Sequence, residues 1–144
     1  MEILRINSQN RQLVNDFLKL AGEPTLEKFR YYDSRPVEII DNHVATFLIR
    51  YESKSIAYGH LDKEDEIIWL GIAIAEAFHG KGLGRLMMTH LLAFARIQKI
   101  PKIKLAVDID NMAAIPLYHK FGFKEINRTK KVLFMEWHLN VKQY

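Results

Sequence analysis

Runs of apolar residues, either unbroken or alternating with polar ones, predict the strands of a sheet along most of the chain. In chain order these runs are residues 2–7, 44–51, 55–61, 67–74, 102–107, 123–127 and 132–139. The second and third flank a short polar turn, which predicts a hairpin. The run at 67–74 is almost wholly apolar, as is typical of a central strand covered on both faces. Gly71 in its middle indicates a bulge or a close backbone approach.

Apolar residues at helical spacing predict helices between these strands. The apolar positions of the first helix are Leu13, Phe17 and Leu20. Ser8 can cap this helix, and Gly22 with Pro24 ends it. The later helices are predicted at residues 26–32, 83–99 and 112–120. The resulting order, β-α-α-β-β-β-α-β-α-β-β, predicts an α/β fold, with a mixed sheet and helices on its faces, in a single domain that spans residues 1–144.

Composition narrows the class of protein. The chain has 144 residues, of which 49% are hydrophobic, and this suits one globular domain with its own core. The absence of cysteine excludes disulfides, thiolate metal sites and a cysteine nucleophile. No apolar run approaches the ~20 residues that cross a bilayer, and the first residues do not resemble a signal peptide. We therefore expect a cytoplasmic protein with no membrane partner.

The net charge suggests one small anionic ligand, whereas the spacing of the histidines suggests no metal. The formal net charge is +4, but Lys and Arg are scattered along the chain, so we expect no nucleic-acid partner. The six histidines form no H-x-x-x-H or H-E-x-x-H pattern, so we expect no metal. A single polyphosphate ligand would account for a modest positive charge.

A glycine-rich segment lies between the run at 67–74 and the helix at 83–99. Gly80, Gly82 and Gly84 allow positive φ and let backbone N–H groups approach a ligand, and a helix N-terminus favours phosphate. Lys81 and Arg85 add positive charge at the rim. A dinucleotide fingerprint is excluded because Arg85 stands where its third glycine belongs, and a P-loop is excluded because Gly82 follows Lys81. A flexible entry to the helix remains an alternative.

A second block, residues 111–123, follows one strand later, and the two blocks together resemble the GNAT superfamily of N-acetyltransferases. Of the family's Q/R-x-x-G-x-G/A motif, Gly82 and Gly84 match, with His79 in the Gln or Arg slot. The residues that match its N-x-x-A-x-x-L-Y-x-K-x-G-F motif are Asn111, Ala114, Leu117, Tyr118, Lys120, Gly122 and Phe123. The resemblance covers residues 44–127 well and implies the GNAT fold.

The resemblance also implies a site for acetyl-coenzyme A (acetyl-CoA) as co-substrate. The residues that it implies for coenzyme binding are Leu70, Ile72, Ala73, Ile74, His79, Gly80, Lys81, Gly82, Leu83, Gly84, Arg85, Asn111 and Tyr118. Backbone groups of Ile72 and Ile74 would pair with the pantetheine amides, and an N–H of Leu70 or Ile72 would polarise the thioester carbonyl. Because the family uses the His79 position mainly through its backbone N–H, binding should survive this departure.

Catalytic roles follow from the same resemblance. Tyr118 is implied as the general acid that protonates the leaving thiolate, since tyrosine keeps its proton at neutral pH. Glu66, at the start of a strand, is implied as the general base, with His60 or a chain of water molecules as alternatives. Pro116 departs from a regular helix that begins after Asn111, so we expect a distorted first turn there.

The function implied is acetyl-CoA-dependent N-acetylation of the primary amine of a small molecule, by direct attack on the thioester. Tyr31, Arg35 and Trp69 are candidates for the acceptor pocket. Two alternatives remain open: an acetyltransferase acting on a protein N-terminus or lysine, and a non-catalytic coenzyme A sensor. A homodimer is a further expectation from the family.

Overall fold

A computed structural model describes residues 1–140 of the chain. Its strands are β1 (Glu2–Arg5), β2 (Ala45–Tyr51), β3 (Lys54–Glu64), β4 (Ile67–Ile74), β5 (Lys102–Asp108), β6 (Lys124–Arg128) and β7 (Val132–His138). They form one seven-stranded sheet in the order β1-β2-β3-β4-β5-β7-β6. All neighbouring strands are antiparallel except β4 and β5, which are parallel. The predicted α/β fold with a mixed sheet is confirmed.

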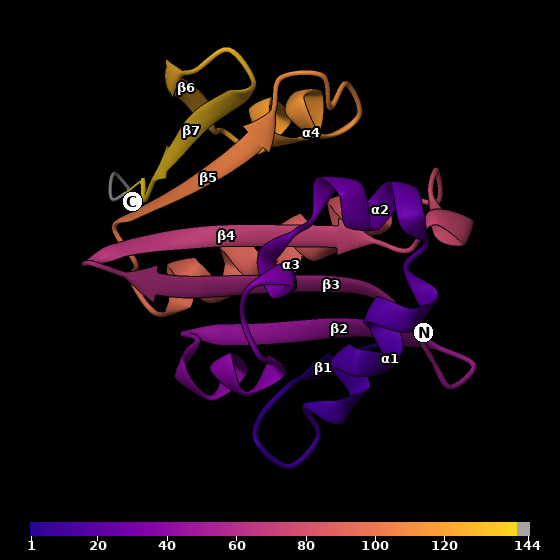
Figure 1. Cartoon of the computed structure of the whole chain (residues 1–144). Coiled ribbons are helices and arrows are strands. Elements are labelled where there is room, and N and C mark those ends of the chain that lie inside the picture. The colour runs from indigo at the N-terminus through magenta and orange to yellow at the C-terminus, as the bar shows by residue number, and fades with distance from the viewer. Residues whose placement is uncertain (141–144) are drawn as a thin grey trace.

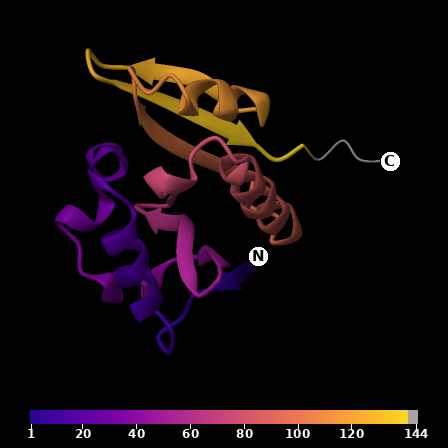
Figure 2. The same ribbon diagram turned by 90° about the vertical axis from the view of Figure 1, so that its right-hand side faces the viewer.

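Helices cover both faces of this sheet. They are α1 (Gln12–Leu20), α2 (Glu23–Lys28), α3 (Leu83–Ile97) and α4 (Ala114–Lys120), with short 3-10 helices at Tyr31–Asp33, Val37–Asn42 and Glu76–Phe78. Figures 1 and 2 show α1 and α2 on one face of β2 to β4, and α3 on the other. No helix within residues 1–140 combines the length and the apolar character that crossing a bilayer requires.

Strand β3 divides the core into two layers because its side chains alternate between the faces. Gly59 faces α3 so closely that a Cβ there would lie 2.6 Å from the Met87 sulfur. Its neighbour Tyr58 faces the other way and packs with Phe17 of α1, at 5.9 Å between ring centroids. By the same alternation, His60 lies on the Tyr58 face. A row of polar and aromatic side chains of β3 is therefore directed towards α1, α2 and the segment that follows them.

Two predicted helix ends at the start of the chain are wrong. Helix α1 begins at Gln12 without a side-chain cap, because the residues before it form a turn of their own. In that turn the Asn10 Oδ1 accepts from the Asn7 N–H at 2.7 Å, and Ser8 caps nothing. Pro24 does not end α1 but stands in the first turn of α2, where a missing N–H costs no helical bond.

The helix that contains Pro116 starts later than the sequence predicts. Helix α4 begins at Ala114, so Pro116 falls within its first turn, where backbone N–H groups have no acceptor inside the helix. Asn111 still performs its predicted capping function, because its Oδ1 accepts from the Ala114 N–H at 3.2 Å. The helix is therefore two residues shorter at its start than expected, and residues 112 and 113 form a turn where the sequence predicts a distorted first turn.

Candidate active site

Strands β4 and β5 separate and leave an open gap in the sheet. Within residues 1–140 they pair at one register position, Trp69 with Lys104. Figure 1 shows them running side by side at first and then diverging towards their carboxyl ends. By contrast, β3 pairs with β4 along the whole length of β4. One edge of β4 is therefore fully paired, and the other becomes free beyond Trp69.

The β3–β4 ladder determines which backbone groups face this gap. The Ala75 N–H donates to the Ile56 carbonyl at 3.0 Å, which makes Ile74 a position whose own N–H and C=O point away from β3. This pattern repeats at every second residue of an antiparallel strand, so the same holds for Ile72. The backbone of Ile72 is therefore directed into the gap, as its predicted pairing with pantetheine requires.

The carbonyl of Ile74 is already bonded. It accepts from the Thr25 hydroxyl at 2.7 Å and from His79 Nε2 at 2.9 Å. Of the Ile74 backbone, only the N–H is thus available to pantetheine. The His79 side chain has a structural function here, because it joins the glycine-rich turn and α2 to the end of β4.

The glycine-rich turn begins α3 with the backbone conformation that its sequence predicts. Gly80 and Gly82 have φ of 76° and 80°, and no atom lies within 4 Å of where a Cβ would be on either. Gly84 is needed for a different reason. A Cβ on Gly84 would lie 3.0 Å from a methyl carbon of Leu117, so the glycine leaves room for α4 to pack against the turn. Lys81 and Arg85 are exposed beside the turn. The first N–H groups of α3 and these two cations suit a diphosphate.

Besides Tyr118, three of the predicted coenzyme-binding residues belong to the core. Leu70, Ala73 and Leu83 are 6%, 6% and 3% exposed. Their side chains pack inside the protein, so only their backbone groups can reach a ligand. This agrees with a site in which the coenzyme is held mainly by main-chain atoms.

Tyr118 of α4 is buried, and its hydroxyl is free to donate. Burial raises the pKa of this phenol above its ordinary value, so it stays protonated at neutral pH. Among residues 1–140, every fully enclosed side-chain nitrogen or oxygen has a hydrogen-bond partner. The Tyr118 hydroxyl has no such partner, so it is not fully enclosed. The hydroxyl must therefore reach open space, as a proton donor to a bound molecule requires.

The structure brings the three predicted acceptor residues to the end of β3. The Tyr31 hydroxyl donates to Asp62 Oδ2 at 2.6 Å, and Trp69 pairs with Asp62 across the sheet. The Arg35 guanidinium lies 4.2 Å from the centre of the Tyr31 ring and 3.5 Å from the Glu64 carboxylate. The pKa of Glu64 is raised, first by its hydrogen bond with Asp62 and then by burial.

Glu66, the predicted base, lies apart from these groups. It stands in the turn between β3 and β4 with φ of 66°. Its side chain is 89% exposed and is 3.5 Å from the Lys63 ammonium. No contact within residues 1–140 joins it to Tyr118.

The sequence did not predict that rings on the same face of β3 form one cluster, which we call the aromatic–histidine cluster. Its members are Phe29, Tyr31, Tyr32, His43, Tyr58 and His60, with neighbouring ring centroids 4.5 to 6.3 Å apart. The Tyr58 hydroxyl bonds to Tyr32 and to His60, each at 2.6 Å. The period-two pattern of Tyr58, His60 and Asp62 is the sequence signal that could have found it.

Burial controls the ionisation of this cluster. It lowers the pKa of His60 well below the ordinary value, and lowers that of His43 as well. It raises the pKa of Tyr31, Tyr32 and Tyr58. The histidines are therefore neutral and the tyrosines protonated at neutral pH.

Ion pairs connect the end of α2 and the segment after it to the far side of the gap. The Lys28 ammonium is 2.7 Å from Asp110 and 3.9 Å from Asp108, at the end of β5, and Arg30 is also 3.9 Å from Asp108. These side chains are at least partly exposed, so each pair contributes little to stability. They nevertheless show that the two sides of the gap approach each other at its mouth.

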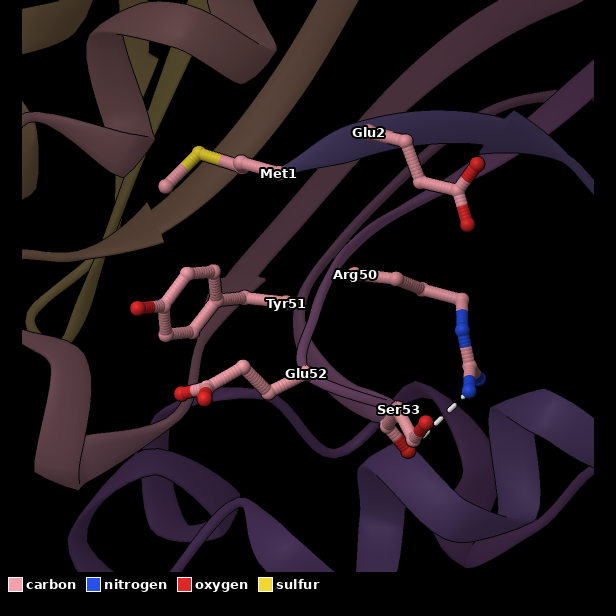
Figure 3. A pocket seen from close by; sticks show the side chains of 6 residues that line it. All are labelled: Met1, Glu2, Arg50, Tyr51, Glu52 and Ser53. Atoms are coloured by element: carbon pink, nitrogen blue, oxygen red, sulfur yellow. Dashed lines mark hydrogen bonds between the residues drawn. The ribbon is translucent and has the colours of Figure 1, made fainter.

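Two surface hollows lie at the two ends of β2, and the second is lined in part by His43 of the aromatic–histidine cluster. One, of about 390 Å³, is formed at the β2–β3 turn by Met1, Glu2, Arg50, Tyr51, Glu52 and Ser53, and Figure 3 shows Arg50 bonded to Ser53 there. The other, of about 480 Å³, lies beside the start of β2 and includes His43. No group of three or more potential metal-ligating side chains within residues 1–140 is arranged to hold a metal ion.

Known proteins share both the architecture and part of the sequence. The model of a family described as the acetyltransferase (GNAT) family matches residues 9–123. Among solved structures, the PaiA N-acetyltransferase of Thermoplasma acidophilum in complex with coenzyme A is similar, with a TM-score of 0.77 and 15% identity. The superposition covers 96% of this chain and 98% of that one. This likeness shows a shared fold.

Two curated proteins are similar over a shorter stretch. Over 61 residues the chain is 36% identical to the ribosomal protein bS18-alanine N-acetyltransferase of Salmonella typhimurium. The matched stretch makes up 42% of this chain and 41% of that protein. Over 65 residues the chain is 37% identical to the spermine/spermidine N(1)-acetyltransferase of Bacillus subtilis. This stretch makes up 44% of this chain and 43% of that protein. The matched segments thus span about two fifths of each relative.

Proposed function

Since the chain belongs to the GNAT family of acetyltransferases, we propose that it transfers the acetyl group of acetyl-CoA to the primary amine of a small molecule. The membership that its two sequence motifs predicted is confirmed. The proposed reaction is direct attack of the neutral amine on the thioester carbonyl, after which the thiolate leaves.

The residues at the gap fit acetyl-CoA. The diphosphate would lie on the turn at Gly80 and Gly82, where a positive φ directs backbone N–H groups outwards and Lys81 and Arg85 supply charge. The pantetheine arm would extend along the free edge of β4 and bond to the backbone of Ile72. When bound, acetyl-CoA supplies the activated acetyl group, and the chain provides its position and a proton donor.

Tyr118 is the proposed donor of the proton that the leaving group needs. As the carbon–sulfur bond breaks, the sulfur would take the proton of the Tyr118 hydroxyl, and the tyrosinate would later regain one from solvent. The raised pKa of Tyr118 keeps the phenol protonated at neutral pH, so a proton is available where the thiolate leaves. Its freedom from other hydrogen bonds within residues 1–140 supports this role.

The small-molecule acceptor is favoured by the wall on the other side of β4. The 3-10 helix Tyr31–Asp33 and the residues around it lie over β3, where Tyr31 and Arg35 contact Asp62 and Glu64. Such a covered wall suits a compact amine better than an open polypeptide groove. The Bacillus relative is named for spermine and spermidine, whereas the Salmonella relative is named for an alanine of a ribosomal protein. A protein N-terminus is therefore the second candidate.

The observation that carries the proposal is the unpaired edge of β4, with the backbone of Ile72 directed into it and the glycine-rich turn at its end. The test incubates the protein with acetyl-CoA and a panel of small amines or N-terminal peptides, and measures the release of free thiol. We expect turnover with small amines. Faster turnover with peptides would transfer the assignment to a protein acceptor. Tight coenzyme A binding without any turnover would indicate a sensor.

A further inference from the structure

His60 lies directly over β4 at the edge of the proposed site. It pairs with Gly71 across the β3–β4 ladder. A Cβ on Gly71 would lie only 2.5 Å from His60 Nε2, so the imidazole occupies the space that a side chain at this position would fill. The next residue of β4 is Ile72, whose backbone is directed into the gap. Gly71 therefore does not mark the predicted bulge, since the β3–β4 register is unbroken, and its missing side chain leaves room for the His60 ring.

One nitrogen of His60 is bonded and the other is open. Nδ1 is 2.6 Å from the Tyr58 hydroxyl. Nε2 has no hydrogen-bond partner within residues 1–140, where every fully enclosed side-chain nitrogen or oxygen has one. Although His60 is only 2% exposed, its Nε2 must therefore be in contact with open space. This is the atom of the His60 ring that a Cβ on Gly71 would approach most closely.

Behind His60, hydrogen bonds continue away from β4. The Tyr58 hydroxyl lies 2.6 Å from His60 Nδ1 and 2.6 Å from the Tyr32 hydroxyl. Tyr58 is fully buried, whereas Tyr32, in the 3-10 helix Tyr31–Asp33, is only partly buried. These three side chains form an unbroken chain of proton donors and acceptors from the open Nε2 to a side chain at the surface.

We propose that His60 is the general base of the reaction and that Tyr58 and Tyr32 conduct the proton away. As the amine nitrogen bonds to the thioester carbonyl, its N–H bond breaks and an Nε2–H bond forms. In the same movement the proton on Nδ1 passes to the Tyr58 oxygen, the Tyr58 proton passes to Tyr32, and the Tyr32 proton passes to water. One proton enters the relay and one leaves it. This inference rests on the proposed acetyl transfer.

The surroundings of His60 explain why a relay suits this position better than a simple base. Burial lowers the pKa of His60 well below its ordinary value, with smaller effects from His43 and Arg35, so an imidazolium here would be costly. The titratable groups whose rings lie against His60 are Tyr31, His43 and Tyr58. Asp62 is the nearest carboxylate along β3. Release of the Nδ1 proton as Nε2 gains one keeps the imidazole neutral throughout.

The other candidate base is less well placed. Glu66 is 89% exposed, pairs with Lys63, and makes no contact within residues 1–140 with the aromatic–histidine cluster. A carboxylate in that environment is well solvated and would have to act through bulk water. His60 differs because its open nitrogen lies against the strand that would hold the thioester.

The test compares pH profiles of kcat/KM for the wild type, His60→Gln and Glu66→Gln, with acetyl-CoA and the best amine of the panel. General base catalysis contributes typically ~100-fold or more, so we expect a loss of about 100-fold in His60→Gln at pH near 7. His90→Gln is the matched control, because His90 packs against Phe47 on the other face of the sheet. A larger loss in Glu66→Gln than in His60→Gln would overturn the assignment.

A weakly basic acceptor gives the sharper measurement. Trifluoroethylamine is a weak base, so its N–H becomes more acidic once the nitrogen bonds to the carbonyl, and water can take that proton more readily. We expect the difference between wild type and His60→Gln to shrink to a few-fold with it, whereas an ordinary alkylamine, with a pKa near ~10, keeps the full loss. An equal loss with both amines would mean that the substitution only disturbs packing, and would overturn the role of His60 as base.

Tyr58→Phe tests the relay without removing a ring. It breaks the connection between His60 and Tyr32, so we expect a loss of about 10-fold or more in kcat/KM, with unchanged affinity for coenzyme A. Near-ultraviolet circular dichroism would show whether His60→Gln folds. If it does not fold, the activity of Tyr58→Phe tests the relay in its place. Wild-type activity in Tyr58→Phe would refute the relay alone. A wild-type protein that acetylates no amine would refute the proposed function, and the relay with it.

Discussion

The two sides of the proposed site are built in different ways. The coenzyme side is one continuous stretch, residues 72–85, which offers main-chain groups of β4, the glycine-rich turn and the start of α3. The acceptor side is assembled from side chains of three separate segments: residues 29–43, residues 58–64 of β3, and Trp69 of β4. The first depends on φ angles and an unpaired strand edge, and the second on the packing of rings and carboxylates.

This difference teaches where specificity can change. A backbone-built surface keeps its chemistry whichever side chains surround it, so proteins with different acceptors can share it. The named acceptors of the Salmonella and Bacillus relatives do differ, one being a protein and the other a polyamine. On the acceptor side, each single side chain decides what fits. Substitutions should therefore act on the coenzyme side only through charge or φ, and on the acceptor side through shape.

The largest expected effect breaks the coenzyme side. In Gly82→Asp a carboxylate would stand among the N–H groups that would hold the diphosphate. Like charges about 4 Å apart repel by about 4 kcal/mol near a protein surface, which corresponds to a loss of ~1,000-fold in coenzyme A affinity. Calorimetric titration with coenzyme A measures it. The fold should persist, because nothing lies within 4 Å of the new Cβ.

Gly82→Asn is the control for this substitution. Asparagine has nearly the shape of aspartate and also tolerates the φ of 80°, but it carries no charge. We expect a loss in affinity of no more than about 10-fold, the remainder being backbone strain of ~1–2 kcal/mol. Equal losses in the two variants would show that shape alone matters here, and unaltered affinity in Gly82→Asp would refute the diphosphate assignment.

The next effect concerns Tyr118, the proposed proton donor. Tyr118→Phe should lower kcat by ~100-fold, or about 2.7 kcal/mol of barrier, because the thiolate must then take its proton from water. Affinity for coenzyme A and thermal stability should stay as in the wild type, since the hydroxyl bonds to no group within residues 1–140. Tyr51→Phe, at the exposed end of β2, is the matched control. Unchanged turnover in Tyr118→Phe would exclude it as the general acid.

A substitution at Gly71 should damage the acceptor side through shape. In Gly71→Ala the new methyl group would lie 2.5 Å from His60 Nε2, so the ring would have to move within a packed cluster. Overpacking of this kind costs about 1–3 kcal/mol, which urea denaturation would reveal. The double variant Gly71→Ala with His60→Ala removes the clash, so its loss should be smaller than the sum of the two single losses. Additive losses would mean that the methyl group meets something other than His60.

The same contrast explains what the sequence could predict. Strand β4 and the φ of Gly80 and Gly82 were predicted correctly, because apolar runs and glycine turns are local signals. The aromatic–histidine cluster was not, because tertiary packing brings Tyr31, His43 and Tyr58 together from distant segments. Helix ends were misjudged where one residue type permits two readings. Proline can end one helix or begin the next, and the sequence around Pro24 does not distinguish these cases.

The smallest expected effect lies at the Ile74 carbonyl, where α2 and the glycine-rich turn are hydrogen-bonded to β4. Thr25→Val removes one of its two donors, but His79 still bonds to the same oxygen. We therefore expect a loss of about 1 kcal/mol or less in the free energy of unfolding.

The double variant Thr25→Val with His79→Phe would leave that carbonyl without either donor, and should lose more than the two single variants together. Urea denaturation of the four proteins measures this coupling. Strict additivity would show that His79 does not compensate for Thr25. A coupling of about 1 kcal/mol would establish that histidine stands in the Gln or Arg slot of the motif in order to fasten α2 and the glycine-rich turn to β4.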